Sequence, residues 1–196
     1  MINKTEYKIF ELLLSNLTLE LSISDIAKLT KKKFPQIHRI VSILAKKGLV
    51  NIKSAGKSKI IKLDFLRYHR EYIQAEMERN SVFLEKHEIN SIHKIISQID
   101  KQFICLLFGS TLDNKKSDID LLFIISNDTE AGKFERTIKN QLSLYNVDIN
   151  VINEKSLFEM WAQPQKFNLG NEILKKHVVL SGAERFINLL KQQYGN

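Results

Sequence analysis

The chain has 196 residues, which is long enough for one large domain or two small ones. Its hydrophobic content of 43% and charged content of 27% are typical of a soluble protein. Its longest apolar run is far shorter than the roughly 18 residues of a membrane span, so we expect no membrane partner. The N-terminus lacks a signal-peptide core and Cys105 is the single cysteine, so we expect a reducing, cytoplasmic setting.

The formal net charge of +8 is unevenly distributed along the chain. Residues 1–62 hold 13 Lys or Arg against 4 Asp or Glu, whereas residues 63–196 hold 17 against 18. The whole basic excess therefore lies in the first third. This asymmetry predicts a nucleic-acid-binding segment joined to a near-neutral one, and the alternative is a solvated lysine-rich surface.

The first 64 residues show three helical patterns followed by a hairpin pattern. We expect helices over 5–16, 25–30 and 35–47, with N-caps at Thr5 and Ser24 and a stop at Gly48. Ile26, Ala27 and Leu29 are expected to face the core. Two short strands then surround a glycine-containing turn, Ser54 to Lys57.

This region resembles a winged helix-turn-helix domain, and ISDIAKLTKKKFPQIHRIVSILAKKGLVNIK is similar to the helix-turn-helix core of many prokaryotic regulators. The resemblance implies that the third helix enters the major groove of double-stranded DNA while the hairpin, or wing, meets phosphates. The residues it implicates in DNA binding are Lys32, Lys33, Gln36, His38 and Arg39 on the helix side and Lys53, Lys57 and Lys59 on the wing. A protein-interaction or dimerisation module is the alternative.

Residues 65–90 have no Gly or Pro and favour a linker helix, expected from Phe65 to about Glu88. Its broken apolar stripe could pack on its own domains or on a second copy in a homodimer. A further helix, Ser91 to about Asp100, is expected to pack on the sheet that follows.

The stretch from Phe103 to Ile125 carries the clearest chemical pattern of the chain. An apolar strand ends at Gly109-Ser110, and after a polar loop Asp118-x-Asp120 opens a second apolar strand. Carboxylates at i and i+2 of a strand point the same way about 7 Å apart, which suits a divalent cation. The glycine and serine suit phosphate oxygens, so the pattern predicts nucleotide chemistry.

Gly109-Ser110, seven residues and then Asp118-x-Asp120 resemble the signature of the DNA polymerase β-like nucleotidyltransferases, particularly the minimal ones. In that family a third aspartate on a neighbouring strand completes the site, and Asp148 within 146–152 matches it. The resemblance implies two Mg²⁺ ions, an NTP substrate, and Asp118, Asp120 and Asp148 as catalytic metal ligands. Gly109 and Ser110 would hold phosphates, and Asp148 would take the proton of the acceptor hydroxyl.

The sequence thus predicts an α+β chain with a winged helix-turn-helix over 1–64, a linker helix over 65–90 and a nucleotidyltransferase domain with a mixed sheet over 91–196. The expected function is transfer of a nucleoside monophosphate to a hydroxyl of protein or nucleic acid such as RNA, directed by DNA binding. The alternative is a transcriptional regulator that senses NTP without turnover, in an antitoxin-like manner. A small-molecule nucleotidyltransferase is least favoured, because no acidic cluster beyond the aspartates would attract cationic substrates. Trp161 is expected in the core, and the piece 172–182 is expected to close the domain with a helix and a strand.

Overall fold

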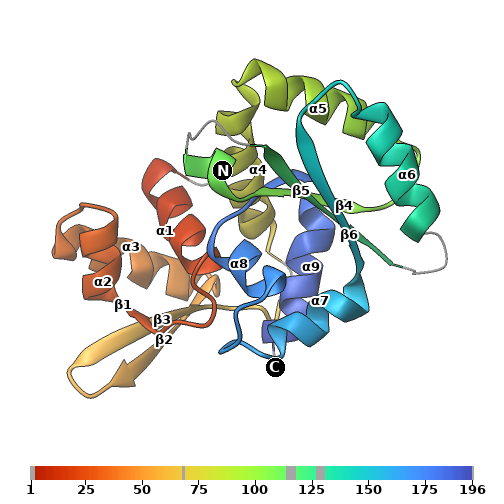
Figure 1. Cartoon of the computed structure of the whole chain (residues 1–196). Coiled ribbons are helices and arrows are strands. Elements are labelled where there is room, and N and C mark those ends of the chain that lie inside the picture. Colours follow the sequence, from red (N-terminus) through yellow and green to blue (C-terminus); the bar gives the residue numbers. More distant parts are fainter. Residues whose placement is uncertain (1–2, 68, 114–117, 127–130, 196) are drawn as a thin grey trace. The chain divides into compact units, whose positions relative to one another are not determined.

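The computed structural model describes residues 3–67, 69–113, 118–126 and 131–195 (Figure 1). The fold is a mixture of helices and strands, and the strands described form one three-stranded and one four-stranded sheet. The chain divides into two compact units, Met1–Ala75 with Leu190–Asn196 and Glu76–Leu189. Within the part of the chain described here, every helix is too short or too polar to span a bilayer.

The first unit has the element order and strand pairing of a winged helix. Its antiparallel sheet has the order β1-β3-β2. The elements are α1 (Lys4–Leu14), β1 (Leu21–Ser22), α2 (Ile23–Leu29), α3 (Phe34–Lys46), β2 (Val50–Ala55) and β3 (Ser58–Leu63). Ala55 pairs with Ser58, so a two-residue turn joins β2 to β3, and Gly56 supplies the positive φ of +58° there. Figure 1 shows this hairpin projecting beyond the helices of its unit.

Capping boxes begin the first two helices two residues before the expected positions. Asn3 accepts from the amide of Glu6 at 3.0 Å, and the Glu6 carboxylate accepts from the amide of Asn3 at 2.9 Å. Ser22 and Asp25 form the same reciprocal pair at the start of α2. The hydroxyl and amide of Ser22 both donate to Asp25 and lower the pKa of its carboxyl group. The predicted caps at Thr5 and Ser24 are therefore wrong, since the reciprocal partner three residues on decides the cap.

The three helices bury one apolar stripe each against the sheet. The buried residues are Ile9, Phe10, Leu13 and Leu14 of α1, Ile23, Ile26 and Ala27 of α2, and Ile37, Val41 and Leu44 of α3. Leu29 is 57% exposed, so the expectation that it faces the core is wrong. It occupies the last position of a seven-residue helix, whose buried stripe is already complete at Ile26 and Ala27.

The helix expected over 65–88 corresponds to α4 (Arg70–Leu84), and the helix expected from Ser91 to about Asp100 corresponds to α5 (His87–Ser97). α4 begins later than expected because the amide of Leu66 donates to the Asp64 side chain at 3.0 Å, which holds a turn before this helix. α5 begins four residues before the expected Ser91 and buries Ile89, Ile92 and Ile96. Helix propensity was uniform across this stretch, so tertiary packing decided where the helix breaks.

Tyr72 fastens the start of α4 to the winged helix. Its side chain is 1% exposed, and its ring packs edge-on against Phe10 and Phe65, each with a centroid distance of 5.5 Å. The hydroxyl donates to the carbonyl of Leu49 and accepts from the amide of Asp64 at 3.0 Å. One side chain therefore joins the residue before β2, the end of β3 and the start of α4.

Replacing Tyr72 with Phe should lower the free energy of unfolding by about 0.5–1.5 kcal/mol, because the Leu49 carbonyl and the Asp64 amide lose the hydroxyl and keep only the 3.3 Å hydrogen bond between them. Urea denaturation of the variant and of the unmodified chain measures this loss. Tyr145→Phe is the matched control, since the described structure gives the Tyr145 hydroxyl no hydrogen bond. Equal losses in both variants would contradict the assigned role.

The second unit is a four-stranded mixed sheet with flanking helices. The strand order is β6-β5-β4-β7, with β4 antiparallel to β5 and β7 and with β5 parallel to β6. After α5 the elements are β4 (Ile104–Phe108), a 3-10 turn η1 (Ser110–Asp113), β5 (Ile119–Ile125), α6 (Ala131–Gln141), β6 (Val147–Asn153), α7 (Glu154–Trp161), α8 (Leu169–Lys175), β7 (Val178–Ser181) and α9 (Ala183–Tyr194). The helix and strand expected over 172–182 correspond to α8 and β7.

Alternate residues of β5 face the α5 and α6 side of this sheet. Ile119, Leu121, Phe123 and Ile125 belong to one buried cluster with apolar residues of α5 and α6. The intervening Leu122 and Ile124 are also fully buried, so both faces of the strand are covered from Leu121 onward. Asp120, at the second position of the strand, is only partly buried.

A buried ionic cluster joins α4 to the loop before β7 within the second unit. Glu76 is fully buried, with its Oε2 3.4 Å from Nε2 of His177 and 3.6 Å from a terminal nitrogen of Arg79. Arg79 also donates to the carbonyl of His177 at 3.1 Å. Burial by itself raises the pKa of Glu76, but the neighbouring Arg79 and His177 outweigh this effect, and the pKa lies below its ordinary value.

Candidate functional sites

The register of β5 places Asp120 between two chemically distinct neighbours. It pairs with Phe108 of β4, the residue before Gly109, and with Asp148 of β6. Paired residues on adjacent strands about 4.8 Å apart project to the same face of a sheet. The structure therefore brings Asp120 and Asp148 side by side, although 28 residues separate them along the chain.

Gly109 lies directly against the Asp120 carboxylate. A Cβ at this position would stand 1.9 Å from Oδ2 of Asp120, and the backbone has φ of +75°. Both the space and the conformation require glycine, because any side chain would displace Asp120. The bare backbone therefore lies beside the carboxylate, as expected where a phosphate and a cation are to be held together.

Asp118 precedes β5 and is held by hydrogen bonds on both sides. Its carbonyl accepts from Thr111 Oγ1 at 3.0 Å, and its carboxylate accepts from the amide of Asn146. The amide of Ile119 donates to the carbonyl of Asn146 at 3.0 Å. The sequence analysis did not identify Thr111 or Asn146 as site residues. Asn146 lies two residues before Asp148, and side chains two apart in an extended segment point the same way. The expected loop includes residues 114–117, which lie outside the described structure.

The three aspartates concentrate negative charge at this end of the sheet. Partial burial raises the pKa of Asp120, and the charges of Asp148 and then Asp118 raise it further. Carboxylate oxygens are the ligands that Mg²⁺ prefers, so the donor chemistry and the Gly109 backbone fit the ion that the family resemblance implies. Within the described ranges, no three His, Cys, Asp or Glu side chains are already positioned to hold a metal ion. Asp118 instead bonds to Asn146, and Asn150 Nδ2 lies 3.4 Å from Asp148 Oδ2.

We expect Asp120→Asn to increase the thermal stability at pH 7, because the variant removes a carboxylate that is partly buried and that its neighbours repel. A raised pKa means that the folded chain binds a proton more tightly than the unfolded one, so the wild type loses stability as the pH rises from the unfolded pKa to the folded pKa. The advantage of the variant should therefore shrink as the pH falls back through this window. Melting temperatures from pH 4 to pH 8 measure it, with the exposed Asp100→Asn as control. A variant less stable than wild type at pH 7 would contradict the electrostatic description.

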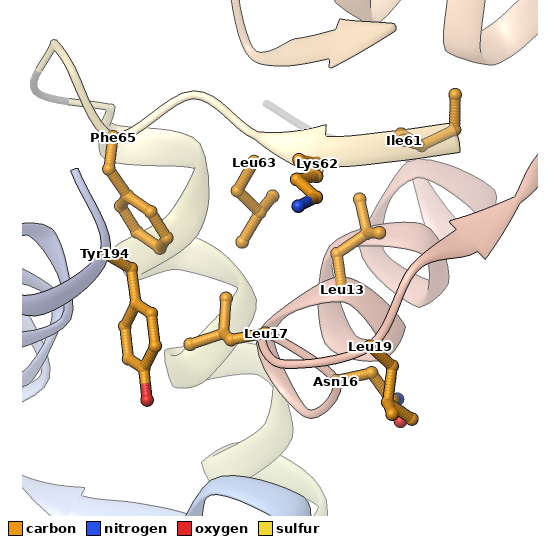
Figure 2. Close-up of a pocket in the computed structure, with 9 residues that line it drawn as sticks. All are labelled: Leu13, Asn16, Leu17, Leu19, Ile61, Lys62, Leu63, Phe65 and Tyr194. Carbon is orange, nitrogen blue, oxygen red and sulfur yellow. The ribbon is translucent and has the colours of Figure 1, made fainter. Parts of the chain in front are cut away.

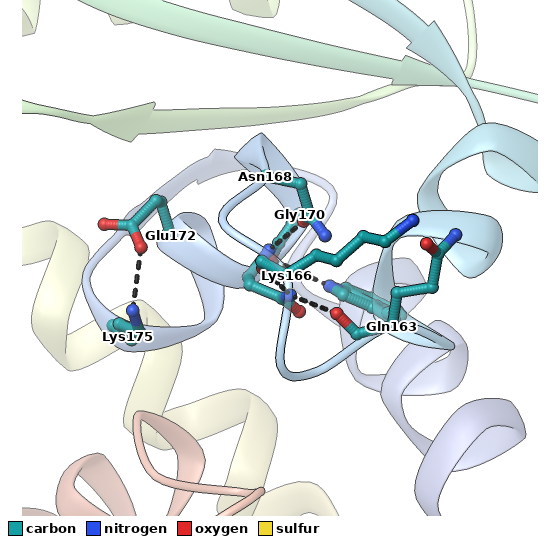
Figure 3. A network of polar contacts seen from close by, with 8 residues as sticks. Gln163, Lys166, Asn168, Gly170, Glu172 and Lys175 are labelled. Carbon is teal, nitrogen blue, oxygen red and sulfur yellow. Dashed lines mark hydrogen bonds and ion pairs between the residues drawn. The ribbon is translucent and has the colours of Figure 1, made fainter.

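Two lysines that follow this site in sequence are already paired. Lys176 forms an ion pair with Asp113 of η1, and Lys175 lies 2.7 Å from Glu172. Trp161 is 1% exposed and donates from Nε1 to the carbonyl of Gly170 at 3.0 Å, which confirms its place in the core. Asn171 donates to the carbonyls of Gln163 and Lys166, each at 2.8 Å. Figure 3 shows the polar contacts of this segment between α7 and α8.

The residues predicted to bind DNA lie on two adjoining parts of the first unit. Lys32, Lys33, Gln36 and Arg39 are exposed at and after the turn that leads into α3, and Lys53, Lys57 and Lys59 are exposed on the β2–β3 hairpin. Lys31 makes that turn with a positive φ of 54°. His38, Lys57 and Lys59 line one cavity of about 220 Å³ together with Ser22, Ile23, Ser24, Phe34 and Ser58. The structure therefore brings the start of α3 and the wing together.

A second cavity of the first unit, of about 210 Å³, is shown in Figure 2. Its lining is Leu13, Asn16, Leu17, Leu19, Ile61, Lys62, Leu63, Phe65 and Tyr194. Asn16 donates to the carbonyl of Leu12 at 2.8 Å, Lys62 lies 3.5 Å from Glu20, and burial raises the pKa of Tyr194 to about 12. None of the predicted site residues lines this cavity, and we assign it no ligand.

Comparisons with known proteins do not assign the chain to a family. No family model and no curated protein matches the chain. Among solved structures, MepR, a transcription regulator of the Staphylococcus aureus multidrug efflux pump MepA, is 20% identical, with a TM-score of 0.36 over 51% of this chain and 67% of that one. TrmBL2, an archaeal chromatin protein with a novel mode of DNA binding, is 15% identical, with a TM-score of 0.27 over 98% of this chain and 91% of that one. Both scores are too low to carry an argument.

Proposed function

We propose that this chain is a DNA-binding regulator in which the winged helix binds duplex DNA and the aspartate cluster of the second unit binds an NTP. The observation that carries the DNA proposal is the convergence of His38 from α3 with Lys57 and Lys59 from the wing around one cavity. An α-helix with its side chains is about 10–12 Å across and fits the major groove of B-DNA, which is about 12 Å wide. With α3 in the groove, the wing lysines reach the flanking phosphates.

The exposed residues divide into two roles by their chemistry. Lys32, Lys33 and the wing lysines carry point charges that suit phosphates, so they contribute affinity that falls with salt. Gln36 and Arg39 present paired donors or acceptors that suit adenine and guanine edges, so they contribute sequence preference. No acidic side chain belongs to this set.

Replacing Lys53, Lys57 and Lys59 together with Ala should weaken binding to all duplexes alike. The slope of log K against log salt should fall by about 0.9 for each phosphate that a lysine no longer neutralises, or by about 2.7 for three phosphates. Fluorescence anisotropy with labelled duplexes at several salt concentrations measures both effects. Lys133, Lys139 and Lys155 of the second unit, replaced together with Ala, make the same charge change and should leave the slope unaltered. An unchanged slope in the wing variant would rule out the proposed role of the wing.

A second candidate function, transfer of a nucleoside monophosphate, is favoured by the pairing of Asp120 with Asp148 beside Gly109. In this reaction the acceptor hydroxyl oxygen bonds to the α-phosphorus as the bond to the bridging oxygen of the β-phosphate breaks, and pyrophosphate leaves. Asp148, the exposed carboxylate on β6, takes the hydroxyl proton. The Gly109 amide and Ser110 bind phosphate oxygens. Asp118, Asp120 and Asp148 would hold Mg²⁺, which when bound would neutralise charge on the triphosphate.

Labelled NTPs distinguish the two functions. A regulator that only senses nucleotide should bind NTP in the presence of Mg²⁺, change its affinity for duplex DNA, and release the nucleotide intact. A transferase should place label on protein or RNA, and Asp118→Asn with Asp120→Asn should abolish the labelling. Asp100→Asn with Glu85→Gln, both exposed and outside the aspartate cluster, should retain it. Failure of every NTP to bind would contradict both roles of the second unit.

A further inference from the structure

The cavity between α3 and the wing contains an exposed aromatic ring that DNA-phosphate contacts leave unexplained. Phe34, the first residue of α3, is 48% exposed. Its ring lies against His38, with 5.9 Å between centroids and an interplanar angle of 38°. The ring is thus held in place beside the wing lysines, and it leaves a large apolar surface in a basic, polar setting.

The size and lining of this cavity restrict what it accepts. Its volume of about 220 Å³ is below the roughly 300–1,000 Å³ of sites that enclose a whole small molecule. It therefore suits one part of a larger molecule. Phe34 provides its apolar surface, since the neighbouring Ile23 is only 2% exposed, whereas Lys57 and Lys59 provide cationic groups. An occupant that satisfies both has an apolar group within reach of a phosphate.

Duplex DNA offers one such combination in its major groove. The C5-methyl of thymine is the apolar group that the base edges present there, and phenylalanine is among the side chains that contact it. The first residues of a recognition helix are also those that meet base edges. We infer that Phe34 is a specificity-determining residue that contacts a thymine methyl group, while Lys57 and Lys59 hold a neighbouring phosphate. This inference rests on the proposed binding of duplex DNA by the first unit.

The test removes the methyl group from the DNA as well as the ring from the protein. The full chain first selects its preferred duplex from a random pool, and each thymine of that duplex is then replaced singly by deoxyuridine. Wild type should lose about fourfold in affinity at the contacted position, the amount expected for one buried methyl group. Phe34→Ala should bind the thymine and deoxyuridine duplexes equally, and Phe34→Leu should retain part of the discrimination. Leu66→Ala, which removes a side chain 72% exposed and outside this cavity, should discriminate like wild type.

The possible failures are distinct. Salt-dependent duplex binding that is insensitive to every deoxyuridine replacement would overturn this inference and leave the proposed DNA binding intact. Discrimination that survives in Phe34→Ala would overturn it as well, and so would a change of oligomeric state in that variant, because Phe34 would then serve an interface between copies. Absence of binding to any duplex would overturn the proposed function itself.

Discussion

The pairing register of β5 is the constraint on which the acidic site depends. It places Asp120 opposite Phe108 on one side and opposite Asp148 on the other. Because side chains alternate along a strand, a shift by one residue would turn Asp120 toward the apolar cluster of α5 and α6 and move Ile119 or Leu121 to its partly exposed position. The apolar residues on either side of Asp120 oppose such a shift. The core thereby fixes the position of the carboxylates that the site uses.

The electrostatic energy of the aspartates at this end of the sheet is unfavourable, and apolar packing in the rest of the unit offsets it. Partial burial disfavours the charged form of Asp120, and the charges of Asp148 and Asp118 add to this cost. The strands that bear Asp120 and its neighbours are held by fully buried apolar residues on both faces of β5. A cation or a proton bound here relieves the repulsion, which is why such a cluster suits a reversible ligand better than a purely structural role.

The winged helix combines buried apolar residues with exposed basic ones. Its helices and strands bury apolar stripes on one side, while the lysines proposed to contact DNA lie on the turn into α3 and on the hairpin, exposed to solvent. Lysine side chains lose little by exposure, so this arrangement is compatible with a stable fold and leaves the charges available to a polyanion. Phe34 differs from its surroundings because its apolar ring is exposed among these charges.

The sequence predicted many of the secondary-structure elements and the acidic residues of the site, because these depend on local chemistry. Apolar periodicity predicted the three helices, the hairpin and the strands within a few residues, and the isolated Asp148 between Val147 and Ile149 marked a second acidic strand end. Other features depend on partners far apart in the chain and needed the tertiary structure. These include the position of the break between α4 and α5, the hydrogen bond from Asn146 to Asp118, the close approach of Gly109 to Asp120, and the cavity that joins Phe34 to the wing. The sequence by itself determined which residues can bind phosphate, metal or DNA, since that is a property of each side chain. Only the tertiary structure decided which of them stand together, since strand register and packing set distances that no local pattern encodes.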